Sequence, residues 1–212
     1  VLKQNSYRLL RLINNIMDIT KVNSDSDQLN LINCNIVSVL EEIVMSTVLY
    51  ASEKKRNIIF DTDNEEIILA CDEDKIERIM LNLISNAIKF SDCDTDIEVK
   101  INTNLDLNRV YISIKNYGSN IEFKDREKIF ERFYRVDNSL NRKNEGCGIG
   151  LFLCRKFIEM HGGEIFLDNI DNGTQFSFYL PINITEEKIN NPIIQKDSLI
   201  ERCNIEFSDI YT

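Results

Sequence analysis

The sequence contains little glycine, proline and histidine, and it lacks tryptophan. Its 212 residues include 7 glycines, 2 prolines, 1 histidine and no tryptophan. No apolar run approaches the ~18 residues of a membrane-spanning helix. The net charge is −10, which argues against a general nucleic-acid binder, because phosphate contact requires an excess of Lys and Arg. A chain of 212 residues is long enough for one or two domains.

Paired cysteine motifs are also missing, because the six cysteines are scattered and none forms a C-x-x-C pair. That spacing predicts free thiols in a reducing cytoplasm, instead of a disulfide framework or a zinc site. No signal peptide opens the sequence, and Val1 leads directly into a helical pattern. We therefore expect a fragment of a longer protein.

The first 22 residues predict one long amphipathic helix, in which Leu2, Leu9 and Ile16 recur every seven positions. This helix could belong to the core of a single domain, or form half of an antiparallel or dimeric bundle whose partner helix is missing. The polar run 23–27 is typical of a linker and favours the bundle. We expect units at 1–24, 30–182 and 183–212. Within the last, residues 199–211 could form a short docking segment or a frayed end.

Helices and strands alternate irregularly along residues 30–182. Helices are predicted over 35–55 and 72–90, a short aromatic helical turn over 129–135, and a further helix after residue 150. Strands are predicted over 57–61, 67–71, 97–101, 110–114, 164–168 and 174–180, the last two joined by an Asn-Gly turn. The pattern predicts an α+β fold, a two-layer sandwich with helices on one face of a mixed, mostly antiparallel sheet.

Five of the seven glycines lie between Asn144 and Ile165. Gly146, Gly148 and Gly150 alternate immediately before an apolar helical run. Such a stretch could cradle phosphate at a helix N-terminus, or act as a flexible hinge. The spacing matches neither the dinucleotide fingerprint nor the Walker loop, so the local pattern leaves both possibilities open.

Two asparagines, Asn82 and Asn86, lie four residues apart on one face of the helix predicted over 72–90. They could form a solvated polar face, or aim amide oxygens at a Mg²⁺ ion whose other ligands are phosphate and water. Asparagine is a middling helix former, so two of them beside an apolar stripe favour the functional interpretation. Lys89, one helical turn further on, would add a positive charge toward the same triphosphate.

Four motifs then follow one another in order. They are Asn82–Phe90 (NLISNAIKF), Phe130–Arg135 (FERFYR), Gly146–Leu151 (GCGIGL) and His161–Ile165 (HGGEI). Together they resemble the N, F and G2 boxes of the sensor histidine kinase catalytic domain, a branch of the gyrase–MutL ATPase superfamily. The resemblance covers roughly residues 35–181. Residues 1–22 resemble the second helix of that family's dimerisation and phosphotransfer bundle.

The resemblance implies a site for ATP and Mg²⁺. Asn86 would be the metal ligand, and Arg135 would reach the phosphates. Three glycines, Gly146, Gly148 and Gly150, would hinge a lid over ATP, formed by residues ~119–145. His161 would be structural. The remaining nucleotide-binding residues implied by the resemblance are Asn82, Lys89, Phe90, Asn116, Gly118, Ile121, Phe133, Ile149, Leu151 and Thr174.

Two features bear on the reaction. Superfamily members that hydrolyse ATP carry Glu where Asn82 stands, and an amide is no general base, so we expect ATP to be held for transfer. Residues 1–22 contain no histidine, so the family's phosphoacceptor would lie on an upstream helix. We expect no autophosphorylation of this chain alone, and relay of the phosphate to a response regulator receiver domain.

The adenine-binding box departs from the family's D-x-G-x-G pattern, because this chain carries Asn116-Tyr-Gly-Ser-Asn120. Asn116 can still accept a hydrogen bond from the adenine amino group, but without charge assistance. The loss is ~1–2 kcal/mol, or roughly ten- to thirty-fold in affinity. Asn120 is the milder change, since Asn tolerates left-handed backbone.

The leading hypothesis is the catalytic part of a two-component sensor histidine kinase. The full-length protein would dimerise through the N-terminal helix and reach the membrane only through segments upstream of this chain. One alternative is a degenerate kinase-like regulatory or scaffolding module, motivated by Asn116. Another is a serine kinase of the anti-sigma-factor type, which the bundle-like helix at 1–22 speaks against.

Overall fold

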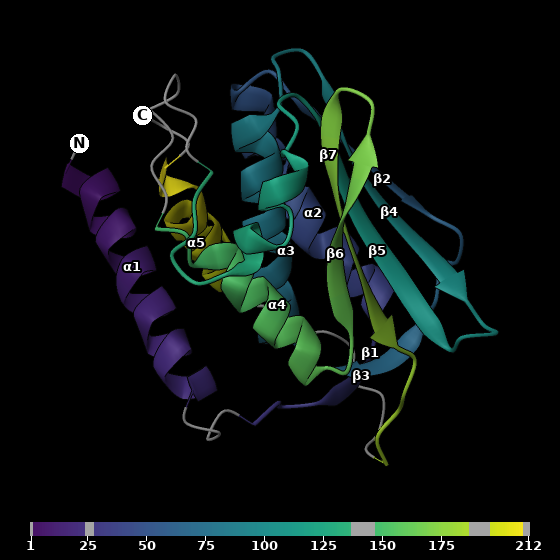
Figure 1. Ribbon diagram of the computed structural model, residues 1–212. Helices are drawn as coiled ribbons and strands as arrows, with labels where there is room; N and C mark the ends of the chain where they lie inside the picture. Colours follow the sequence, from purple (N-terminus) through teal and green to yellow (C-terminus); the bar gives the residue numbers. More distant parts are fainter. Residues whose placement is uncertain (1, 24–27, 137–146, 187–195, 210–212) are drawn as a thin grey trace.

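The computed structural model describes residues 2–23, 28–136, 147–186 and 196–209 (Figure 1). The helices are α1 (Leu2–Asn23), α2 (Ile36–Glu53), α3 (Glu73–Phe90), α4 (Gly150–Met160) and α5 (Lys196–Glu206), with 3-10 turns η1 (Phe123–Asp125), η2 (Lys128–Phe130) and η3 (Phe207–Asp209). The strands are β1 (Ile32–Asn35), β2 (Asn57–Thr62), β3 (Ile68–Cys71), β4 (Asp96–Asn104), β5 (Arg109–Tyr117), β6 (Glu164–Ile170) and β7 (Gly173–Pro181).

The main sheet has the strand order β2-β4-β5-β7-β6, in which β2 runs parallel to β4 and the other neighbours are antiparallel. Buried and partly exposed residues alternate along β5, as expected for a strand with one buried face. Helices α2, α3 and α4 cover that face (Figure 1). The predicted α+β sandwich with a mixed, mostly antiparallel sheet is confirmed.

Helix α3 forms where the sequence predicts it, because its start signal and its apolar spacing agree. The side chain of Asp72 accepts a hydrogen bond from the backbone N–H of Lys75 at 3.2 Å and caps the helix. Glu73 and Asp74 place negative charge in the first turn, near the positive end of the helix dipole. The predicted apolar side is buried throughout, at Ile76, Ile79, Met80, Leu83, Ile84 and Ala87.

The structure corrects the predicted aromatic helical turn at 129–135. Helical geometry ends with η2 at Phe130, and Phe133 has a φ of 65°. A bulky residue rarely adopts this left-handed conformation, so a helix cannot continue through it. The backbone N–H of Phe133 instead donates a hydrogen bond to the carbonyl of Gly148 at 2.8 Å.

Strand β1 has no counterpart in the sequence prediction. It is four residues long and pairs with β3 in a separate antiparallel sheet, with Cys34 opposite Leu69.

The predicted Asn-Gly turn does join β6 to β7, where Asn172 has a φ of 57°. Among the described residues, no helix is both long and apolar enough to cross a membrane.

Helices α1 and α5 form a third layer outside α3 and α4 (Figure 1). An ion pair joins Asp18 of α1 to Arg78 of α3. The outer face of α1 carries exposed apolar side chains, among them Leu9 at 59% and Ile16 at 56% exposure. The sequence left residues 199–211 undecided, and the structure places the helix α5 between α1 on one side and α2 and α3 on the other.

Candidate functional site

The two asparagines of α3 occupy a polar edge of the helix that is largely shielded from water. Asn82 is 7% exposed, so the alternative of a solvated face does not hold for it. The side-chain amide of Asn86 donates a hydrogen bond to Oδ1 of Asn82 at 3.2 Å, as the four-residue spacing predicts. Lys89 follows on the same edge, partly exposed, with its Nζ 5.9 Å from the ring centroid of Phe90.

Gly150 brings the glycine-rich stretch against Asn82. A Cβ at Gly150 would lie 2.8 Å from Cγ of Asn82 and would overlap its amide nitrogen. No side chain fits there unless the asparagine moves. The first residue of α4 and the first asparagine of α3 are therefore in direct contact, although 68 positions separate them in the sequence.

Gly148 ties the same stretch to the aromatic motif. Its φ is +66°, and a Cβ would lie 2.6 Å from the carbonyl oxygen of Tyr134. Its own carbonyl accepts the Phe133 hydrogen bond described above. The Tyr134 hydroxyl donates to Asp125 at 2.6 Å, which fixes the aromatic motif on η1. The aromatic motif and the glycine-rich motif are thus joined by a hydrogen bond, and Phe133 is 60% exposed.

Asn116 marks the opposite end of the candidate site. It lies on the buried face of β5, 3% exposed, directly opposite Thr174 of β7. Its side-chain nitrogen is buried and has no hydrogen-bond partner. An unpaired buried donor costs ~1–3 kcal/mol, so this nitrogen is available to donate to a ligand or to water. Gly118 forms a β-bridge with Ser91, so this box adjoins the end of α3.

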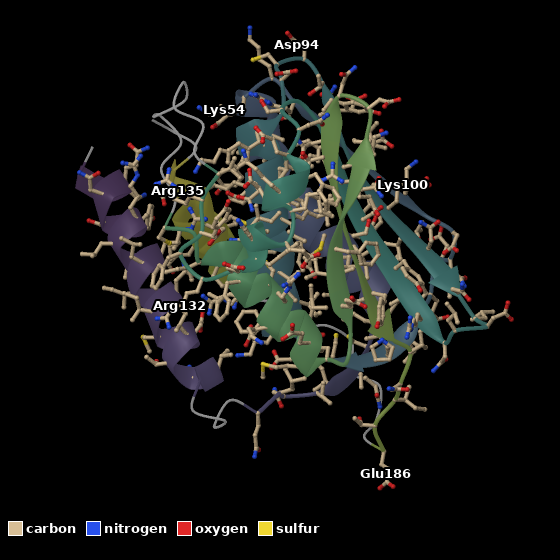
Figure 2. The ribbon with its side chains drawn as sticks, viewed as in Figure 1. Lys54, Asp94, Lys100, Arg132, Arg135 and Glu186 are labelled. Atoms are coloured by element: carbon tan, nitrogen blue, oxygen red, sulfur yellow. The ribbon has the colours of Figure 1, made fainter. Side chains whose placement is uncertain are left out.

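The other predicted residues fall around these contacts. Ile149 is buried and Leu151 half-buried on either side of Gly150, and the carbonyl of Ile121 accepts a hydrogen bond from Arg126. Arg135, the last residue of the aromatic motif, is exposed on the side of the molecule that faces α1 (Figure 2). Gly146 lies outside the described residues, as does the lid from residue 137 to 145.

His161, the only histidine, is held by two hydrogen bonds. Its Nε2 accepts from the backbone N–H of Asp72 at 3.0 Å, and its Nδ1 lies 2.7 Å from the carbonyl of Phe157. The first bond requires an unprotonated Nε2, so Nδ1 carries the proton and donates it. Burial lowers the pKa of His161. These contacts fit the structural role that the resemblance implies.

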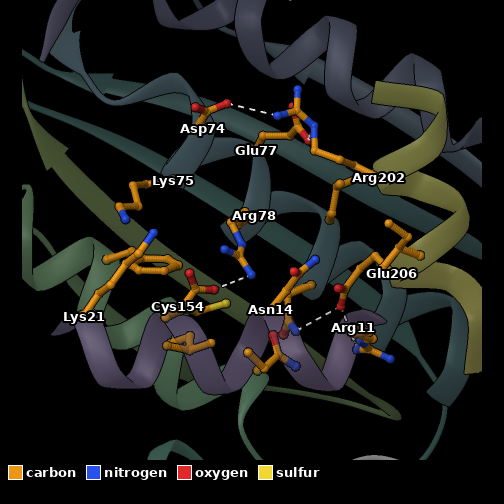
Figure 3. Close-up of a pocket in the computed structure, with 18 residues that line it drawn as sticks. Arg11, Asn14, Lys21, Asp74, Lys75, Glu77, Arg78, Cys154, Arg202 and Glu206 are labelled. Carbon is orange, nitrogen blue, oxygen red and sulfur yellow. Dashed lines mark hydrogen bonds and ion pairs between the residues drawn. The ribbon is translucent and has the colours of Figure 1, made fainter. Parts of the chain in front are cut away.

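A cavity of about 320 Å³ lies between α1, α3, α4 and α5 (Figure 3). Of the predicted site residues, Asn82 and Gly150 line it. Its charged lining residues are Arg11, Asp18, Lys21, Asp74, Lys75, Glu77, Arg78, Arg202 and Glu206. Burial raises the pKa of Glu77 to about 7, an effect that nearby Arg202 opposes.

Sequence reasoning missed the residues that α1 and α5 contribute to this cavity, above all Arg11, Arg202 and Glu206. A signal existed in the tail, where Leu199, Cys203 and Phe207 recur every four residues. That spacing predicts a helix with one buried stripe. It carries no information about where the helix docks.

Comparison with known proteins defines the family. The family model described as histidine kinase-, DNA gyrase B-, and HSP90-like ATPase matches residues 71–184, more than half of the chain. The chain belongs to this family. Membership confirms the resemblance drawn from the four motifs, which all lie within the matched residues.

Individual relatives are histidine kinases. Sensor histidine kinase WalK of Bacillus subtilis (strain 168) is 32% identical over 188 residues, covering 88% of this chain and 31% of the relative. The chain thus spans about a third of that protein. The nucleotide-free catalytic domain of histidine kinase ThkA superposes with a TM-score of 0.65 at 28% identity, covering 73% of this chain and 97% of that one. ThkA in complex with the response regulator protein TrrA gives a TM-score of 0.65 at 25% identity, covering 81% and 48%.

Proposed function

We propose that this chain is the catalytic part of a sensor histidine kinase. It binds Mg²⁺–ATP and passes the γ-phosphate to a histidine on a helix upstream of this chain, for relay to the receiver domain of a response regulator. The main support for the proposal is the contact of Gly150 with Asn82, which brings the glycine-rich motif against the motif Asn82–Phe90.

The residues present suit a magnesium triphosphate. Mg²⁺ prefers oxygen ligands, and because the Asn86 nitrogen donates to Asn82, the Asn86 carbonyl oxygen is the atom that can ligate the ion. Bound Mg²⁺ would offset the negative charge of the phosphates. Lys89 and Arg135 would bind phosphate oxygens, and the N-terminus of α4 adds free backbone N–H groups behind Gly150.

The reaction would be transfer instead of hydrolysis. Asn82 stands at the position from which hydrolytic relatives activate water, and its amide cannot accept a proton from water near neutral pH. The exposed apolar side chains of α1, such as Leu9 and Ile16, would pack in the full-length dimer, where the upstream helix carries the phosphoacceptor.

The binding step is tested by calorimetric titration of the chain with Mg²⁺ and the non-hydrolysable ATP analogue AMPPNP. We expect saturable binding that depends on Mg²⁺ and is lost in Asn86→Ala. The control is Asn102→Ala, because Asn102 is exposed on the outer face of β4. Equal binding by the wild type and Asn86→Ala would remove the metal-ligand assignment, and no binding by the wild type would refute the proposal.

A second candidate is a degenerate kinase-like regulatory or scaffolding module, favoured by Asn116 in place of the family's acid. Phosphotransfer separates the two. With the upstream helix restored, a kinase puts acid-labile phosphate on its histidine and then on a receiver domain. A regulatory module binds nucleotide and transfers nothing.

A further inference from the structure

Helix α5 lies outside the residues that the family model matches, yet its apolar side is fully docked. Leu199 is 3% exposed, and Cys203 and Phe207 are 0% exposed. The Phe207 ring stacks on Tyr50 of α2, with centroids 4.8 Å apart and planes at 20°. The Tyr50 hydroxyl donates to Asn204 at 3.1 Å. This segment is a packed part of the fold.

The polar side of α5 bonds to α3. Nε of Arg202 lies 2.7 Å from a carboxylate oxygen of Glu77, whose side chain is 2% exposed. A second nitrogen of Arg202 lies 3.0 Å from Asp74 (Figure 3). Because Glu77 is buried, its charge depends on Arg202 for compensation. Arg202 therefore links α5 to the N-terminal half of α3.

One turn further, Glu206 reaches the candidate nucleotide site. Its Oε1 accepts a hydrogen bond from Nη2 of Arg11 at 2.6 Å and from Nδ2 of Asn82 at 3.3 Å. Gln4 of α1 also donates to the carbonyl of Ser208 at 3.3 Å. The end of α5 thus joins α1 to the first asparagine of the site.

This position conflicts with a bound triphosphate. Glu206 and its partner Arg11 are only 17% and 15% exposed, so water screens their charges weakly. A phosphate group near Asn82 would face the carboxylate of Glu206 at close range. The Asn82 amide nitrogen would also have to exchange a carboxylate for a phosphate oxygen. Nucleotide binding and docking of Glu206 therefore oppose each other.

We propose that α5 is an autoinhibitory latch. In the docked state, Glu206 is hydrogen-bonded to Asn82 and to Arg11 of α1. Binding of Mg²⁺–ATP would break these contacts and release α5. This inference rests on the proposed nucleotide site. It adds a means of regulation, because a partner that captures the released helix would favour the nucleotide-bound state.

The test uses the full chain with single substitutions, titrated calorimetrically with Mg²⁺–AMPPNP. Glu206→Gln removes the charge and keeps the shape, and we expect about three- to tenfold tighter binding. The matched control is Glu201→Gln, the same charge change on the exposed side of α5, for which we expect no change. Phe207→Ala should also bind more tightly, because it weakens the docking of the helix.

Hydrogen exchange provides a second readout. In the wild type, the amides of residues 199–208 should be protected without nucleotide and should lose protection when Mg²⁺–AMPPNP binds. Equal affinity of the wild type and Glu206→Gln, with unchanged protection, would overturn the latch and leave the proposed function standing. Weaker binding by Glu206→Gln would also overturn it, by placing Glu206 in the binding machinery. If no variant binds nucleotide, the proposed function fails and the latch with it.

Discussion

The space that a side chain at Gly150 would need is filled by Asn82. A Cβ at Gly150 would come within 2.8 Å of Cγ of Asn82, and the two residues join the start of α4 to the middle of α3. A glycine at this position is therefore required by packing against a specific polar side chain. Its φ is not in the left-handed region, so backbone strain is not the reason.

Substitution Gly150→Ala should displace Asn82 and impair nucleotide binding at least tenfold, with ~1–3 kcal/mol lost in the free energy of unfolding from overpacking. Calorimetry and urea denaturation measure the two effects. Gly162→Ala is the matched control, because Gly162 has a φ of +76° and a Cβ there would meet only Pro181 at 3.7 Å. The control should lose stability and keep its affinity. If Gly150→Ala binds nucleotide as tightly as the wild type, the proposed nucleotide site beside Asn82 is wrong.

Substitution Asn116→Asp should tighten binding of Mg²⁺–AMPPNP by roughly ten- to thirty-fold, because a carboxylate restores charge assistance to the hydrogen bond from adenine. Asn102→Asp adds the same charge on the exposed face of β4 and should change little. If Asn116→Asp leaves the affinity unchanged, Asn116 does not contact the base.

Stability should depend on pH through Glu77, whose pKa is raised by burial from 4.5 to about 7. The folded state then holds this proton more tightly than the unfolded state. The contribution of the protonated group is fully present below pH 4.5 and is lost as the pH rises through about 7. In thermal unfolding from pH 5 to pH 8, the stability of the wild type relative to Glu77→Gln should therefore fall. A constant difference would show that Glu77 does not titrate in this range.

Substitution His161→Ala should cost ~1–3 kcal/mol in the free energy of unfolding, because the backbone N–H of Asp72 loses its acceptor next to α3. Nucleotide affinity should stay within twofold of the wild type. Incubation of the wild-type chain with Mg²⁺ and γ-labelled ATP should leave no acid-labile label, since both nitrogens of His161 are hydrogen-bonded. Label that disappears in His161→Ala would refute the structural role.

Much of the fold follows from local signals in the sequence. The cap at Asp72, the apolar spacing of α3, the alternation along β5 and the turn at Asn172 each involve residues within a few positions of one another. Such signals depend on backbone geometry and on the period of the side chains, so they can be read without a structure. The same holds for the pairing of Asn86 with Asn82 across one helical turn.

Tertiary structure decided what depends on distant residues. The four residues of β1 form a strand only because β3 lies beside them, and Phe133 leaves the helical region to bond to Gly148. The docking site of α5 is the clearest case, since Glu206 lies 124 positions from Asn82 and 195 from Arg11. The sequence by itself determined helices α1 to α4, the five strands of the main sheet and the four motifs that identify the family. Only the packing of α1 and α5 decided that a carboxylate from the tail lies at the first asparagine, because that contact is set by the shape and charge of surfaces that chain folding brings together.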